Sequence, residues 1–404
     1  MSDHPILGHV ALAYSPVIDR NRNVTATRLT VFPLQHGAPL DARALLAALA
    51  EAWPVGGSAL WLSAMSESLL QDLMAAEPST HISVEVPAFM ACEEDNVPRI
   101  TRLHANGNTL LLKGRPFREL PREVLPCFKL SIIDLEDDRR AEEGRSGMPP
   151  AAADGTARGI GFVQAGITTV ADMENSFRRG ALSVLGWPID DAIQSGGGKN
   201  AEQPALQAIV QLIDQVHKEA EIEALENTLK RDPPLAYKLL RYINSPAFGL
   251  SVEISSFRHA IMVLGYQRLK RWLALLLATA SKDPNMKPVM FAAVRRGLLM
   301  EELSKDLGSA EMKGELFICG VFSLLDRMFN QPFSELLKTI PVPERVYQAL
   351  IDGTGPYGPY FRLVKAIEGQ QLEDIREACD GLLMSPETIN SALLKALANA
   401  ATLE

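Results

Sequence analysis

The pattern of apolar residues changes near the middle of the chain, and this change restricts the fold more than any other feature. Before it, short β-rich apolar runs alternate with helical or loop segments, as in βα proteins. After it, apolar residues recur at helical spacing almost without interruption. A polar, glycine-rich segment at 194–204 lies between and has a linker's composition. The sequence therefore predicts an α/β domain over 1–193, a linker over 194–204 and an all-helical domain over 205–404.

The first half contains a series of strand candidates that suggests a (β/α) barrel of the TIM type. The runs lie at 10–18, 27–34, 59–63, 81–89, 109–113, 127–133, 160–165 and 182–187. Such barrels typically need about 250 residues, which is more than this half offers. The prolines at 121 and 126 leave little room for a helix, and 142–157 favours a loose loop. We therefore expect an eroded barrel that has lost at least one helix.

Composition and charge are those of an ordinary globular protein. Of 404 residues, 47% are hydrophobic and 22% charged, and the formal net charge is −9. This negative charge disfavours binding to nucleic acid and to anionic membranes. No basic and apolar leader is apparent, and no apolar run approaches the ~20 residues of a membrane span, so a cytoplasmic protein is expected. The cysteines, which lack paired spacing and predict neither disulfides nor zinc, are Cys92, Cys127, Cys319 and Cys379.

The helical half carries three linked motifs in a fixed order. A D-P-P-L turn opens a helix, the helix ends in N-S-P-A-F-G, and I-S-S-F-R-H-A-I-M-V-L-G follows. This order closely resembles the signature of the HDOD domain. Cap and turn chemistry gives most of these residue types a structural reason. The signature residues are Asp232, Pro233, Leu235, Asn244, Ser245, Pro246, Phe248, Gly249, Ser256, Ala260, Ile261, Leu264 and Gly265.

With that cue, the first half resembles a degenerate EAL domain, the barrel fold that hydrolyses cyclic di-GMP in its active members. Y-S-P-V-I-D at 14–19 resembles the opening Y-Q-P-I-x-D strand, and F-K at 128–129 resembles the V-K of V-K-I-D. In this register the E-A-L glutamate falls at Thr27, and the paired aspartates fall near Leu112 and Lys113. Glu85 and Lys129 survive from the family's site.

Hydrolysis by this family's route needs acidic and amide oxygens that hold two hard cations. One carboxylate and one ammonium do not assemble such a site, so the sequence predicts no catalytic residue, no metal, no cofactor and no enzyme. Glu85, Lys129 and Arg28 would form a vestigial site. Because arginine and lysine bind phosphate without metal, Arg28 and Lys129 could still attract an anion at the barrel mouth.

Two other chemistries find less support in the helical half. HD-type metal hydrolysis needs several histidines beside aspartates, whereas this half has only His217 and His259 and the chain has no His-Asp dipeptide. The basic residues Arg268, Lys270 and Arg271 could contact nucleic acid, but such a cluster more often solvates one helix face.

The sequence thus predicts a bacterial signalling scaffold or adaptor that acts through contacts with other signalling proteins. The alternatives are a metal-free receptor for cyclic di-GMP or a related nucleotide and, with less support, a residual phosphodiesterase. We expect neither a membrane nor nucleic acid as partner, and a homo-oligomer is left open.

Overall fold

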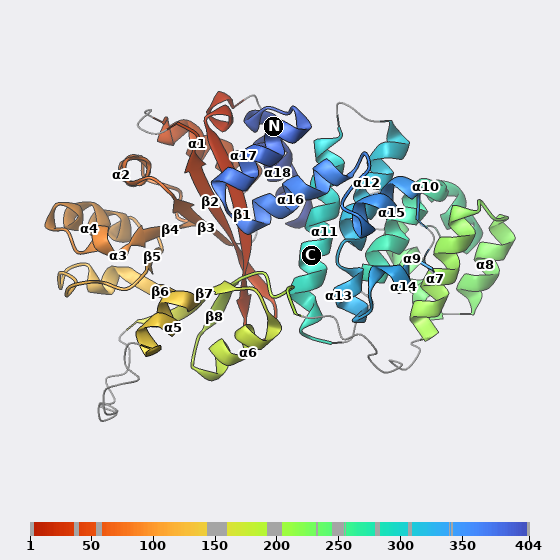
Figure 1. Ribbon diagram of the computed structural model, residues 1–404, viewed down its shortest axis with the longest axis horizontal. Coiled ribbons are helices and arrows are strands. Elements are labelled where there is room, and N and C mark those ends of the chain that lie inside the picture. The colour runs from red at the N-terminus through yellow and green to blue at the C-terminus, as the bar shows by residue number, and fades with distance from the viewer. Residues whose placement is uncertain are drawn as a thin grey trace. The chain divides into compact units, whose positions relative to one another are not determined.

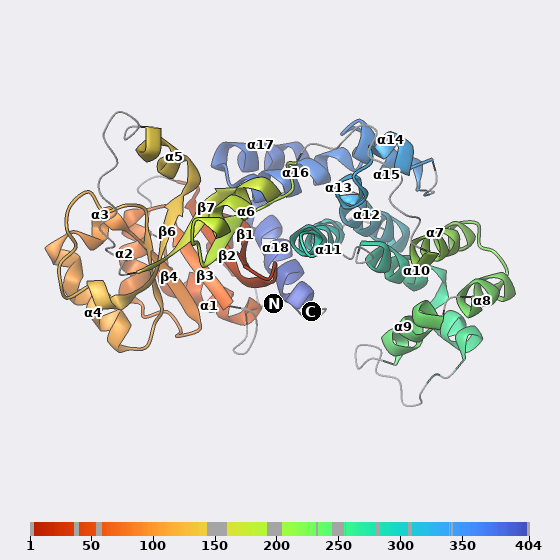
Figure 2. The ribbon, with the colours of Figure 1, turned by 90° about the horizontal axis from the view of Figure 1, so that it is seen from below.

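The computed structural model describes residues 4–35, 40–53, 59–143, 160–191, 204–231, 233–244, 254, 256–278, 283–305, 309–338, 340 and 342–401. Contacts within the chain divide it into two units (Figures 1 and 2). Residues 1–191 and 362–404 form the first unit, and residues 192–361 form the second. The predicted linker at 194–204 lies outside the described residues except for its last residue.

The first unit is built on a closed barrel whose eight strands follow one another in sequence order (Figure 1). They are β1 (Val10–Asp19), β2 (Val24–Pro33), β3 (Ala59–Ala64), β4 (Ile82–Pro87), β5 (Leu110–Lys113), β6 (Phe128–Asp134), β7 (Gly161–Ile167) and β8 (Ser183–Gly186). Strand β1 runs antiparallel to β2 and β8, whereas β2 to β8 pair in parallel. The predicted barrel is therefore confirmed.

Helices cover the outside of the barrel, as βα connections require. They are α1 (Ala42–Ala52), α2 (Glu67–Ala75), α3 (Ala88–Ala91), α4 (Val97–Ala105), α5 (Leu135–Glu143) and α6 (Val170–Arg178). The Asp41 side chain caps α1 and the Ser66 side chain caps α2 by accepting hydrogen bonds from backbone N–H groups. Between β5 and β6 the chain forms a 3-10 turn, η3 (Leu125–Cys127), which accounts for the predicted lost helix. The predicted loose loop at 142–157 lies mostly outside the described residues.

The end of the chain packs on the barrel. Helix α18 (Pro386–Ala401) contacts α1, β1 and the 3-10 turn η1 (Pro5–Gly8), and α17 (Leu372–Leu382) belongs to the same unit. The sequence analysis instead placed residues 362–404 in the helical domain. Helical periodicity shows that a helix has an apolar face, but it does not show which half of the chain that face will cover.

The second unit is helical, as predicted, and the unit boundary falls within α16 (Gly358–Gly369). Its other helices are α7 (Pro204–His217), α8 (Ile222–Lys230), α9 (Pro233–Ile243), α10 (Phe257–Ala278), α11 (Met286–Leu303), α12 (Ala310–Phe322), α13 (Leu325–Phe329), α14 (Phe333–Leu336) and α15 (Glu344–Ile351). At Gly265 the backbone has φ 67°, and this break divides α10 into two helices. A glycine with positive φ is typical of the position just after a helix end, where the sequence placed Gly265. No described helix is both long and apolar enough to cross a bilayer.

Helices α11 and α12 approach each other backbone to backbone. A Cβ atom at Gly320 would lie 2.5 Å from the backbone nitrogen of Gly297 and 2.5 Å from the carbonyl carbon of Arg296. No real side chain fits at such distances. Gly320 therefore sets the spacing of these two helices.

Candidate functional site

A polar layer lies next to an apolar layer inside the barrel. The apolar layer draws residues from seven of the eight strands, so it fills the lumen. Three of the polar residues follow an apolar-layer residue by two positions on the same strand: Arg28 after Ala26, Ser63 after Trp61 and Lys113 after Leu111. Alternate strand residues share a face, so these polar side chains also point inward. Ser63 and Lys113 lie toward the C-terminal ends of β3 and β5, where barrel enzymes place their sites, and Arg28 lies at the middle of β2.

Arg28 and Glu85 form a bidentate ion pair in this layer. Arg28 Nε donates to Glu85 Oε1 at 2.7 Å, and Arg28 Nη2 donates to Glu85 Oε2 at 2.8 Å. Arg28 Nη2 also lies 3.1 Å from Ser63 Oγ. The Glu85 side chain is 1% exposed and that of Arg28 is 12% exposed. The pair is therefore held rigidly, and each charge depends on the other for its burial.

Lys113 supplies a second cation. Its Nζ donates to Ser63 Oγ at 3.1 Å and lies 4.0 Å from Glu85 Oε2. Its side chain is 30% exposed, more than that of Arg28 or Glu85. The cluster of Arg28, Glu85 and Lys113 thus contains two cations and one carboxylate, and its accessible member carries positive charge.

Burial and neighbouring charges act against each other on the ionisation of this cluster. Burial raises the pKa of Glu85, but the charge and hydrogen bonds of Arg28, helped by Lys113 and Ser63, outweigh burial and hold the pKa below its ordinary value. Burial and the nearby Arg28 charge lower the pKa of Lys113, while Glu85 opposes this shift. Glu85 is consequently ionised at neutral pH and keeps Arg28 in place.

The structure brings together two of the three residues expected in a vestigial site. Arg28 and Glu85 are in contact, whereas the side chain of Lys129 is exposed at the start of β6. The next residue, Leu130, packs against the apolar layer, so Lys129 points to the opposite face. Lys113 is the ammonium group beside Glu85, and its position two residues after Leu111 could have identified it from strand alternation alone.

Strand alternation places Thr27, where the E-A-L comparison put the glutamate, outside the polar layer. Thr27 is buried, but it lies on the face of β2 opposite to Arg28 and Ala26. Within the T-R-L run at 27–29, Arg28 is therefore the residue that points into the polar layer. Farther along the same face, Thr30 Oγ1 donates to Gln370 Oε1 at 2.9 Å, so the C-terminal segment reaches the edge of the layer. The sequence analysis did not identify Ser63 or Gln370.

The polar layer does not fit a pair of divalent cations, because its carboxylate at Glu85 is already engaged by Arg28. Elsewhere in the described parts of the chain, no group of three or more His, Cys, Asp or Glu side chains could hold a metal ion.

The HDOD signature residues that are described have structural contacts. The Asn244 amide donates to the carbonyl oxygen of Ile254 at 2.8 Å and accepts from its N–H at 2.7 Å, which fixes the turn after α9. Ser256 Oγ accepts from the N–H of His259 and caps α10. Leu235, Ala260, Ile261 and Leu264 are buried, and Pro233 begins α9. Signature residues outside the described ranges are Asp232, Ser245, Pro246, Phe248 and Gly249.

The barrel with its inward charged layer and the separate helical unit define a protein of the α/β plus all-α class. Residues 203–330 match the HDOD domain family, so the C-terminal region contains an HDOD domain.

The cyclic di-GMP phosphodiesterase CdgJ of Vibrio cholerae is 26% identical over 178 residues, 44% of this chain and 41% of CdgJ. The uncharacterized protein YuxH of Bacillus subtilis is 29% identical over 174 residues, 41% of this chain and 42% of YuxH. The chain thus spans about two fifths of the length of these relatives.

Two solved structures of EAL proteins are also similar to part of the chain. A standalone EAL protein of Vibrio cholerae in its c-di-GMP-bound form shares 14% identity and covers 44% of this chain and 89% of its own, with a TM-score of 0.29. The FimX EAL domain of Pseudomonas aeruginosa, bound to c-di-GMP, shares 11% identity and covers 46% of this chain and 92% of its own, with a TM-score of 0.32.

The prediction that the chain is not an enzyme is contradicted by the match to CdgJ, which is named a phosphodiesterase. That prediction was based on the metal-binding side chains that are missing at the positions of the EAL motifs. Such a count does not test the activity of relatives that are similar over part of their sequence. The coarser prediction, a protein of cyclic di-GMP-related signalling, is supported by the same comparison.

Proposed function

We propose that this chain is a cyclic di-GMP signalling protein whose barrel binds cyclic di-GMP, or a related cyclic dinucleotide, at the cluster of Arg28, Glu85 and Lys113. The activity named for CdgJ supports this class of ligand. The observation that carries the proposal is the surplus of positive charge in an inward layer at the C-terminal strand ends. A cyclic dinucleotide presents two phosphodiester anions, which guanidinium and ammonium groups bind without metal.

Lys113 is the contact residue in this proposal. An ammonium group carries three N–H donors, and the Lys113 Nζ uses two of them, on Ser63 Oγ and on the weak acceptor Met65 Sδ, 3.5 Å away. A phosphate oxygen is a stronger acceptor than the thioether sulfur. Arg28 adds charge from deeper in the layer, while Glu85 holds its guanidinium group in a fixed direction.

The test is a calorimetric titration of the full chain with cyclic di-GMP. The Lys113→Met variant removes the accessible cation, and Lys129→Met removes a cation from the opposite face of the barrel wall. We expect Lys113→Met to weaken binding and Lys129→Met to bind as the unchanged chain does. No binding by the unchanged chain, or equal weakening in both variants, would overturn the proposal.

Hydrolysis of cyclic di-GMP is the second candidate function, and the match to CdgJ favours it. The same purified chain is incubated with cyclic di-GMP and Mg²⁺ or Mn²⁺, and the linear dinucleotide is measured. Turnover that Glu85→Gln abolishes, while the variant remains folded at the assay temperature, supports this candidate. Turnover at the same rate in Glu85→Gln would contradict this candidate, because the activity would then come from a contaminating enzyme and not from the Glu85 site.

Contact with other signalling proteins is proposed for the helical unit, because resemblance to the HDOD domain implies regulation through protein partners. Met262 on α10 is 56% exposed, so its side chain is available for contact with a partner. Affinity capture with the full chain and with its Met262→Asp variant tests this role. A partner lost only from the variant supports it, whereas identical sets of captured proteins contradict a role for this face of α10.

A further inference from the structure

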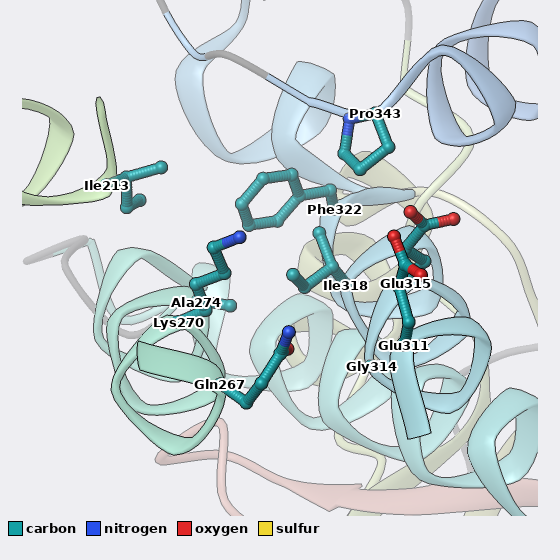
Figure 3. Close-up of a pocket in the computed structure, with 10 residues that line it drawn as sticks. All are labelled: Ile213, Gln267, Lys270, Ala274, Glu311, Gly314, Glu315, Ile318, Phe322 and Pro343. Carbon is teal, nitrogen blue, oxygen red and sulfur yellow. The ribbon is translucent and has the colours of Figure 1, made fainter. Parts of the chain in front are cut away.

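The helical unit contains a groove between α10 and α12 (Figure 3). Two cavities of about 180 Å³ and 230 Å³ share Gln267, Lys270, Gly314 and Ile318 in their walls, so they adjoin each other. Their combined size falls within the roughly 300–1,000 Å³ of small-molecule sites. The groove therefore has room for one small ligand.

One end of the groove is cationic. Four basic side chains line this end, Arg268, Lys270, Arg271 and Lys313, and the carboxylate among them is Glu301. Arg271 Nη1 donates to Glu301 Oε1 at 2.8 Å, so this carboxylate is already paired with one cation. Lys270 and Lys313 line the same cavity and add two positive charges, which favour a phosphate group there.

Lys270 joins the two ends of the groove. It lines both cavities, and its ammonium group points into the space beside Phe322 and Ile318 (Figure 3). Among the residues that the structure describes, Lys270 has no ion-pair partner. Its half-buried ammonium group is therefore accessible to an anion that enters the groove.

The other end of the groove is apolar with carboxylates at its edge. The apolar side chains are Ile213, Ala274, Ile318, Phe322 and Pro343. The carboxylates of Glu311 and Glu315 lie on one side of this cavity (Figure 3). Glu315 accepts a hydrogen bond from the Tyr357 hydroxyl at 2.5 Å and lies 3.6 Å from Arg345. The exposed Glu311 carboxylate is the acceptor that faces the cavity for a ligand's N–H group.

We infer that this groove binds a purine nucleoside phosphate. The phosphate lies beside Lys270 and Lys313, next to the Arg271–Glu301 pair. The flat base packs on the apolar end, and an amino group of the base donates to Glu311. Such a nucleotide combines the three features that the groove matches: an anionic phosphate, a flat base and an amino group that can donate a hydrogen bond. The groove shares no residue with the cluster of Arg28, Glu85 and Lys113, so failure of cyclic di-GMP binding at the barrel would not affect it.

The experiment titrates the full chain with guanosine 5′-monophosphate, with guanosine and inorganic phosphate as partial ligands. We expect the nucleotide to bind at least tenfold more tightly than either partial ligand. Lys270→Met should weaken nucleotide binding at least tenfold. Lys338→Met, which removes an exposed lysine from another part of the unit, should leave it unchanged.

A second variant blocks the groove without removing a charge. Gly314 lies on α12, and a Cβ atom there would meet Gln267 Oε1 at 3.4 Å, so a longer side chain would enter the groove. Leucine favours a helix more than glycine, so Gly314→Leu should keep the melting temperature while it abolishes binding. Equal binding by Gly314→Leu and the unchanged chain would overturn the inference. So would nucleotide binding no tighter than that of phosphate, or tighter binding of a single-stranded oligonucleotide.

Discussion

Arg28 and Glu85 face each other across the inside of the barrel, and two hydrogen bonds of 2.7 and 2.8 Å join them. The strands that carry them, β2 and β4, are not neighbours, because β3 lies between them. The pair therefore ties together separate parts of the barrel wall. Its burial makes the barrel's stability depend on both partners at once.

Removal of one partner of this pair should destabilise the barrel. Glu85→Leu leaves the Arg28 charge buried without its carboxylate, and we expect a loss of about 3–5 kcal/mol in the free energy of unfolding. Arg28→Met combined with Glu85→Leu should regain most of that loss, because no buried charge remains. Urea denaturation of the full-length single and double variants measures both values. A double variant as unstable as Glu85→Leu would show that the ion pair is not the cause.

Acid should weaken the barrel through Glu85. Its pKa in the folded chain lies below the ordinary value of 4.5, so its stabilising contribution is complete above that value. The contribution is lost as the pH falls through the lower folded pKa. We expect the melting temperature of the unchanged chain to fall more steeply below about pH 4.5 than that of Glu85→Gln. Parallel curves for the two proteins would contradict this assignment.

The C-terminal helix should be needed for a stable barrel. The buried Asn390 amide donates to the carbonyl oxygens of Leu7 at 2.8 Å and Val10 at 2.7 Å, and it accepts from the N–H of Leu12 at 3.0 Å. Asn390→Ala leaves these backbone groups without that partner, at a cost of about 1–3 kcal/mol or more. Chemical denaturation measures the change. The exposed Glu377→Ala on α17 is the control, and equal effects of the two substitutions would contradict the role of Asn390.

Two glycine substitutions should have opposite effects. Gly320→Ala places a Cβ atom against the backbone of α11, and we expect a loss of about 1–3 kcal/mol. Gly381 lies within α17, and a Cβ atom added there would meet no other atom within 4 Å, so Gly381→Ala should gain about 0.5–1 kcal/mol. Thermal unfolding of both variants checks the signs. Stabilisation by Gly320→Ala would show that α11 and α12 can separate at little cost.

Local patterns predicted the elements of the fold well. Short apolar runs predicted the strands, and Gly265 after a helical stripe predicted the break in α10, because both depend on neighbours in sequence. The position of 362–404 was different. Helix α18 covers β1 through Asn390 and apolar contacts that join the two ends of the chain, and helical periodicity carries no information about such distant partners.

The candidate site shows the same difference between local and distant information. Comparison by motif selected Lys129, but alternation along β5 and β6 turns Lys113 inward and Lys129 outward. Arg28 and Glu85 were both selected from the sequence, yet their direct pairing across β3 depends on barrel closure. The groove between α10 and α12 includes Lys270 and Arg271, which the sequence analysis interpreted as a solvated helix face. Lys313 lines the same cavity as Lys270 and Arg271, and this depends on the packing of α12 against α10, which the sequence alone does not show.

The sharpest check on the barrel site is the ratio of two dissociation constants for cyclic di-GMP, that of Lys113→Met divided by that of Lys129→Met. Both substitutions remove one lysine charge from the same barrel, so overall charge cancels in the ratio. We predict a ratio of at least about ten, equivalent to roughly 1.4 kcal/mol of binding free energy. A ratio near one would contradict a ligand seated on the inward polar layer.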